Sequence, residues 1–138
     1  MTYVAKEIEK LVKELTELAK NKKTHPVVGT GQCVEVPKFY AGAPATPLWK
    51  EGKQVRGNLN LAAGTAIATF INGKYPSLAH GNHAALYLKQ DASGIYVVDQ
   101  WNDIYRLQMR KIPFKGFNRD GTPVHGRSDN GDAFSVIE

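Results

Sequence analysis

Apolar residues recur at steps of three and four through the first part of the chain, which is the spacing of one face of an α-helix. The pattern predicts a helix over residues 4–21, with an apolar stripe of Val4, Ile8, Leu11, Val12, Leu15, Leu18 and Ala19. Pro26, Gly29 and Gly31 then interrupt the pattern. We therefore expect an N-terminal amphipathic helix within residues 1–24, most simply a packing element, followed by the main domain over residues 25–138.

Strand signals dominate the second half of the chain. The runs TAIATFI (65–71), HAALYL (83–88) and IYVVD (95–99) are apolar and rich in β-formers, and turn residues separate them. Further strand segments are expected within 105–113 and over 133–137, the last closing a sheet edge. Residues 42–64 and 115–132 have the composition of loops. A helix followed by a meander of strands predicts an α+β fold.

The only cysteine, Cys33, follows a glycine-rich turn in GTGQCVEV (29–36), where a helix could begin. A thiol at the start of a helix has a lowered pKa, and the unpaired N–H groups of the first turn can bind an oxyanion. Pro37 is tolerated only in a first helical turn, so the helix must begin close to it or be distorted. A lone cysteine is also often a small buried apolar residue.

His83 opens one predicted strand, and Asp99 ends the next, sixteen residues later. If the two strands pair as a hairpin, the carboxylate lies near the imidazole. Such a histidine can take the proton of Cys33, and the carboxylate can orient its ring. Each residue alone could be purely structural, but the order of cysteine, histidine and acid is more informative than any one of them.

Four neighbouring residues are weaker candidates. Gln32 and the backbone at Val34 flank the cysteine and could serve the oxyanion, and Trp49 and Trp101 could line a substrate cleft or anchor loops. His80 lies three residues before His83, but one cysteine and no further ligand cluster make a metal site improbable. No cofactor is expected.

Composition limits the partners. The chain has 138 residues, a size typical of one domain, and its net charge of +5 is dispersed and accompanies no nucleic-acid-binding motif. Nucleic acid is therefore not an expected partner. The sequence contains no apolar run near the ~20 residues of a membrane span, so membrane insertion is not expected. It also shows no secretion signal, which indicates synthesis in the cytoplasm without the general secretory route.

Several blocks of the sequence resemble papain-like cell-wall amidases of the CHAP and NlpC types. GTGQCVEV is similar to their nucleophile segment, GNHAALYL to their histidine strand, and VVDQW to the strand that carries the third residue. Over residues 27–138, these blocks together with GAPATPLWKEGKQVRGN, GTAIATF, NGKYPS and NGDAFSVIE resemble a small bacterial family related to the amidase effectors of type VI secretion.

The resemblance implies a papain-like α+β core, in which N-terminal helices pack on an antiparallel sheet. It implies Cys33 as nucleophile, His83 as base and Asp99 as the orienting residue of a peptidoglycan amidase or endopeptidase that works through a thioester. It further implies secretion without a signal peptide, action in the periplasm of a target bacterium, and a peptidoglycan peptide as substrate. An immunity protein would then be a natural partner.

Two other functions remain open at this stage. Pro37 and the lysine-rich N-terminal helix depart from the pattern that we associate with such amidases, and they would suit an inactive papain-like module that binds wall peptides or a protein. A transferase would keep the same three residues but pass the acyl group to an amine or a lipid instead of water.

Overall fold

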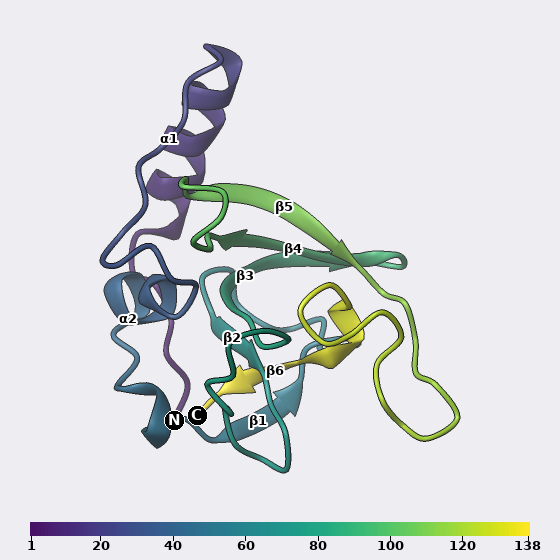
Figure 1. Cartoon of the computed structure of the whole chain (residues 1–138). Coiled ribbons are helices and arrows are strands. Elements are labelled where there is room, and N and C mark those ends of the chain that lie inside the picture. Colours follow the sequence, from purple (N-terminus) through teal and green to yellow (C-terminus); the bar gives the residue numbers. More distant parts are fainter.

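Six antiparallel strands form one sheet in the computed structural model, which describes residues 1–138 (Figure 1). Their spatial order is β1-β6-β2-β3-β4-β5. The strands are β1 (Glu51–Gln54), β2 (Ala66–Thr69), β3 (Ala84–Asp91), β4 (Gly94–Asp99), β5 (Gln108–Pro113) and β6 (Phe134–Ile137). The helices are α1 (Ile8–Lys20) and α2 (Glu35–Ala41), with short 3₁₀ turns at Thr46–Leu48 and Gly131–Ala133. The predicted α+β class is confirmed.

The first helix begins four residues later than the apolar pattern predicts. Residues 3–5 are extended instead, and they bond to the chain at the start of β2: Ala5 N–H donates to the carbonyl of Gly64, and Ala66 N–H donates to that of Tyr3. From Ile8 onward α1 buries its apolar stripe in a cluster shared with Leu86 of β3 and Val98 of β4. Neither helix has the length and apolar composition needed to span a membrane.

The second helix accommodates Pro37 without distortion. The helix α2 begins at Glu35, so Pro37 is its third residue. A backbone N–H at that position has no acceptor within a helix, so a proline loses no hydrogen bond there. Val36 is fully buried in the same cluster as Leu86 and Val98. The doubt that Pro37 raised about the helix after Cys33 is thereby removed.

Two expectations about the sheet edge are wrong. Residues 42–64 are not all loop, because β1 lies within them, and β6 is an inner strand because β1 pairs outside it, with Glu51 opposite Ile137 and Gln54 opposite Ser135. The sequence of β1, EGKQ, is polar and mostly exposed, as befits an edge strand. Such a strand carries neither the alternation nor the apolar run by which strands are recognised in a sequence.

The predicted hairpin of β3 and β4 is present and determines where the polar residues lie. Leu86 faces Val98 in its register. Extended by one position, the register places Asp99 opposite Ala85, so Asp99 lies on the same face as His83, two residues before Ala85. The carboxylate and the imidazole are therefore diagonal neighbours at one end of the hairpin.

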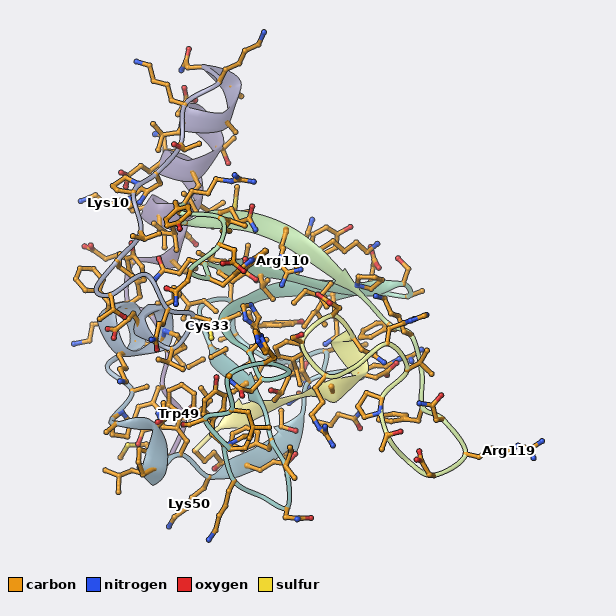
Figure 2. The ribbon with its side chains drawn as sticks, in the orientation of Figure 1. Lys10, Cys33, Trp49, Lys50, Arg110 and Arg119 are labelled. Atoms are coloured by element: carbon orange, nitrogen blue, oxygen red, sulfur yellow. The ribbon has the colours of Figure 1, made fainter.

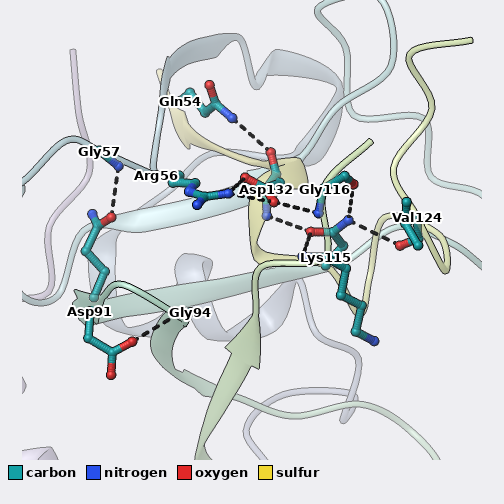
Figure 3. Close-up of polar contacts among 11 residues, drawn as sticks. Gln54, Arg56, Gly57, Asp91, Gly94, Lys115, Gly116, Val124 and Asp132 are labelled. Carbon is teal, nitrogen blue, oxygen red and sulfur yellow. Dashed lines mark hydrogen bonds and ion pairs between the residues drawn. The ribbon is translucent and has the colours of Figure 1, made fainter. Parts of the chain in front are cut away.

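Residues 114–130 form a long excursion between β5 and β6, with Arg119 at its outer tip (Figures 1 and 2). Asp132, which is 4% exposed, holds the base of this loop. Arg56 Nη1 donates to both of its carboxylate oxygens at 2.9 and 3.1 Å, and the N–H of Gly116 donates at 2.9 Å (Figure 3). These bonds fix the point from which the chain returns to the sheet.

Candidate active site

Cys33 lies near the middle of the molecule, between the helices and the sheet (Figure 2). The turn before it has left-handed backbone at Gly29 (φ 55°) and Gly31 (φ 89°), a conformation that glycine adopts without strain. Cys33 itself is a free, half-buried thiol two residues before α2. It opens onto a groove of about 830 Å³ that His83 and Arg110 also line.

His83 and Asp99 form a buried pair beside this groove. Nε2 of His83 lies 2.7 Å from Oδ2 of Asp99, and the side chains are 5% and 0% exposed. Because Nε2 is engaged by the carboxylate, the contact between the imidazole and Cys33 uses the other ring nitrogen, Nδ1. The structure thus brings the three predicted residues together in the order thiol, imidazole, carboxylate.

The electrostatics of this group favour a charged pair. Burial alone would lower the pKa of His83, but hydrogen bonds to Asp99 and Cys33 and the negative charges of both groups raise it to about 9. Burial alone would raise the pKa of the Cys33 thiol, but the hydrogen bond to His83 and its positive charge, with smaller help from Tyr75, bring it below the ordinary value. A lowered thiol pKa beside a raised imidazole pKa favours the pair of Cys33 thiolate and His83 imidazolium.

Asp99 also binds Arg110, a residue that the sequence analysis missed. Nε of Arg110 donates to Oδ2 of Asp99 at 2.7 Å, and its guanidinium carbon lies 4.8 Å from the centre of the Trp101 ring. The other carboxylate oxygen of Asp99 is buried without a hydrogen-bond partner. Arg110 faces Val97 on the neighbouring strand, so it shares a face with Asp99. Only the register of β4 and β5 shows that Arg110 lies beside Asp99, and this register cannot be read from the sequence.

Tyr75 is a second contact of the thiol that was not foreseen. Its hydroxyl lies 3.7 Å from Sγ of Cys33 and accepts a hydrogen bond of 2.9 Å from the side-chain amide of Asn82. Burial and the nearby charge of Cys33 raise the pKa of Tyr75, so the phenol keeps its proton. With Asn82 donating to its oxygen, the Tyr75 hydroxyl is free to donate to the Cys33 thiolate.

Gln100, which follows Asp99, ties the cysteine turn to the sheet. Its fully buried side chain accepts from the N–H of Val28 at 2.8 Å and donates to the carbonyls of Val28 at 2.9 Å and Gln32 at 3.0 Å. All three bonds go to backbone just before Cys33. The end of β4 therefore positions the orienting carboxylate and the nucleophile turn together.

The remaining candidates separate into two groups. Gln32 and Trp101 line the groove, and Trp101 lies edge-on to His83 with ring centres 5.9 Å apart. Trp49 does not line it: the ring is 3% exposed, donates through Nε1 to the carbonyl of Pro44 at 2.8 Å and packs on Tyr75. This position does not fit the expectation that Trp49 contacts a substrate, because the loop after α2 covers the ring.

Val34 and His80 are the last two candidates from the sequence. Val34 caps α2 and has half-buried apolar contacts with the sheet, which leaves only its backbone to face a reacting group. His80 is exposed on the rim of the groove. No three His, Cys, Asp or Glu side chains gather closely enough to hold a metal ion.

The comparisons with known proteins decide the family. The family model described as domesticated amidase effector 2 matches residues 5–137. The chain belongs to this family. The match begins before α1, so the family pattern includes the N-terminal helix that the sequence analysis regarded as a departure.

Two curated members of similar sequence come from very different organisms. A type VI secretion amidase effector 2 protein of Salmonella typhi is 39% identical over 121 residues, which cover 83% of this chain and 90% of the relative. The domesticated amidase effector 2 of Ixodes scapularis is 35% identical over 94 residues, which cover 67% of this chain and 58% of the relative.

A solved structure extends the likeness to three dimensions. The structure of a type 6 secretion amidase effector 2 superposes on this chain with a TM-score of 0.75 at 39% sequence identity. The match covers 88% of this chain and 91% of the effector chain. The family resemblance noted in the sequence is thereby confirmed, and so is the fold expected from it.

In this member of the amidase effector family, Gln100 offers a test of how the cysteine turn is held. Replacing Gln100 by leucine leaves the N–H of Val28 without a partner, whereas the carbonyls of Val28 and Gln32 still accept from Gly31 and Glu35. We therefore expect the free energy of unfolding to fall by about 1–3 kcal/mol. Urea titration followed by circular dichroism measures this change. Gln108→Leu is the matched control, because the half-buried side chain of Gln108 makes no hydrogen bond. Equal stability of the two variants would contradict the account of Gln100.

Proposed function

We propose that this protein is a peptidoglycan amidase, and that it cleaves peptide amide bonds of the cell wall through a thioester on Cys33. The observation that carries the proposal is the buried hydrogen bond of 2.7 Å between His83 and Asp99, next to a thiol that faces the same groove. Membership of a family named for amidase effectors supports the reaction class.

The proposed reaction has two halves. The Cys33 thiolate attacks the amide carbon, and the imidazolium of His83 gives its Nδ1 proton to the departing amine, which leaves a thioester. Water then attacks the thioester while neutral His83 takes a proton from the water. The carboxylic acid product and the thiol of Cys33 are thereby released. Asp99 holds the ring in position and stabilises its charged form in both halves.

Donors for the oxyanion are available at the start of α2 and at the groove. The N–H groups of Cys33 and Val34 lie just before α2 and form no backbone hydrogen bond, and Gln32 adds a side-chain amide at the groove. Donors placed around a developing oxyanion lower the barrier of acyl transfer. We propose that one or more of these three residues binds the oxyanion.

The biological setting follows from the names of the relatives. Proteins described as type VI secretion amidase effectors match most of this chain. We propose that this protein is likewise secreted and acts on peptidoglycan in the periplasm of a target bacterium, with an immunity protein as the partner that protects the producing cell.

Mass spectrometry of cell-wall fragments tests the proposed activity. Purified peptidoglycan is incubated with the protein and then digested with a muramidase. We expect new muropeptides whose masses correspond to the addition of one water across one type of amide bond. A muropeptide profile identical to that of the untreated wall would contradict the proposal, and products carrying an added amine in place of water would indicate a transferase.

The pH dependence of hydrolysis follows from the charged pair. Cys33 must be deprotonated and His83 protonated for the first half-reaction. Because the pKa of Cys33 is lowered, the rate should persist below the ordinary thiol range, and it should fall as the pH rises through about 9, where His83 loses its proton. Initial rates measured from pH 4 to 11 on one muropeptide test this. A rate that keeps rising above pH 9 would contradict the assignment of His83.

A further inference from the structure

Arg110 carries hydrogen-bond donors that the protein itself does not use. Its Nε is engaged by Asp99, and Nη2 lies 3.5 Å from Nε2 of His83. Nε2 of His83 donates its own hydrogen to Asp99, so it has no free lone pair to accept a hydrogen bond from Arg110. A guanidinium has five N–H donors. The terminal N–H groups of Arg110 therefore have no acceptor in the protein.

The guanidinium is also held rigidly at the groove. Asp99 fixes one edge of it, the face of Trp101 lies 4.8 Å away, and the side chain is 24% exposed. Arg110 lines the groove together with Cys33 and His83. A planar guanidinium that is already oriented binds a carboxylate through two parallel hydrogen bonds and loses little conformational freedom in doing so.

The position of Arg110 relative to His83 indicates which part of a substrate it would meet. Arg110 lies at the Nε2 side of the ring, whereas Cys33 lies at the Nδ1 side. In the proposed reaction, His83 delivers its proton to the departing amine. A leaving part that extends along the groove past His83 meets the guanidinium of Arg110.

We propose that Arg110 binds a free carboxylate on the residue that supplies the amine of the cleaved bond. This inference rests on the proposed amidase function and names the substrate feature that the site selects. The two acids that line the groove, Asp103 and Asp129, are exposed and have no cationic partner. They disfavour carboxylates next to them, whereas the guanidinium of Arg110 attracts an anionic group.

Two synthetic peptides that differ at one group test the inference. Both contain the amide that the protein cuts; in one the amine-supplying residue has a free carboxylate, and in the other a carboxamide. Binding is measured by calorimetry on the Cys33→Ser protein, which keeps the groove, and kcat/KM is measured on the wild type. We expect the carboxylate peptide to be preferred about tenfold or more in both measurements, because the hydrogen bonds are charge-assisted.

The substitution Arg110→Gln should bring this preference close to one, mainly by weakening the carboxylate peptide. Lys111→Gln is the matched control, because it removes the neighbouring positive charge on β5. The ammonium group of Lys111 pairs with the exposed carboxylate of Asp91 at 3.1 Å. Lys111→Gln should keep the preference. Thermal unfolding of both variants separates loss of folding from loss of selectivity.

Equal binding of the two peptides, no binding of either, or a preference that survives Arg110→Gln would overturn the inference. A different result addresses the proposed function. If the Cys33→Ser protein discriminates between the peptides but the wild type cuts neither, Arg110 reads the carboxylate as inferred and the amidase assignment fails.

Discussion

Replacing Cys33 by serine should reduce the rate of muropeptide release by about 10⁴-fold or more, because removing the nucleophile of such a group abolishes the covalent route. Serine differs from cysteine by one atom and its hydroxyl stays protonated beside the imidazole. Cys33 is half-buried, and its polar neighbours, His83, Tyr75 and the backbone of Ala84, can also accommodate a hydroxyl. The fold should therefore be unchanged, as circular dichroism and thermal unfolding can verify.

The same experiment separates an enzyme from a binding module. If both wild type and Cys33→Ser bind wall fragments and neither cuts them, the protein is a binding module on an amidase scaffold. If both cut them equally well, another group is the nucleophile, and the role proposed for Cys33 is wrong.

The substitution Asp99→Asn should reduce kcat by about 10³–10⁴-fold, the size of effect expected when an imidazole loses the carboxylate that fixes its tautomer. An asparagine has no negative charge to stabilise imidazolium. The pKa of His83, now about 9, should therefore fall, and the alkaline limb of the rate profile should move to lower pH. Both effects are measured in one pH series on a single muropeptide.

The control for Asp99→Asn is Asp91→Asn, at the other end of the same hairpin. Asp91 is exposed, and its carboxylate bonds to the turn at Ser93 and to Lys111. We expect this variant to keep both the rate and the position of the alkaline limb. An Asp99→Asn protein with an unshifted limb would mean that Asp99 does not set the charge of His83, whatever the change in rate.

Local patterns in the sequence predicted most of the strands and made Cys33, His83 and Asp99 candidates, whose roles the family resemblance then implied. The alternating and apolar runs predicted β3 and β4, and their hairpin requires His83 and Asp99 to be neighbours. The glycines before Cys33 predicted its turn. Pro37 misled the interpretation only because its effect depends on where α2 starts, and a shift of one turn decides between a harmless and a disruptive proline.

The supporting residues could not be predicted because they depend on long-range pairing. Arg110 reaches Asp99 only in the observed register of β4 and β5, and Gln100 meets Val28 across 72 positions of sequence. Tyr75 contacts Cys33 from the turn after β2. Gln100 and Tyr75 lie within the blocks VVDQW and NGKYPS, but these blocks do not indicate which distant residues the two side chains contact. The polar strand β1 was missed for the same reason, since its partner β6 is at the other end of the chain.

The rate at which iodoacetamide alkylates Cys33, measured as a function of pH, tests most directly whether the thiol and imidazole form a charged pair. Only the thiolate reacts, so the account predicts that alkylation stays rapid below the ordinary thiol pKa of about 8.5. Alkylation should also persist above pH 9, where hydrolysis falls because His83 has lost its proton. A single rise of the alkylation rate near pH 8.5, unchanged by His83→Gln, would contradict the account.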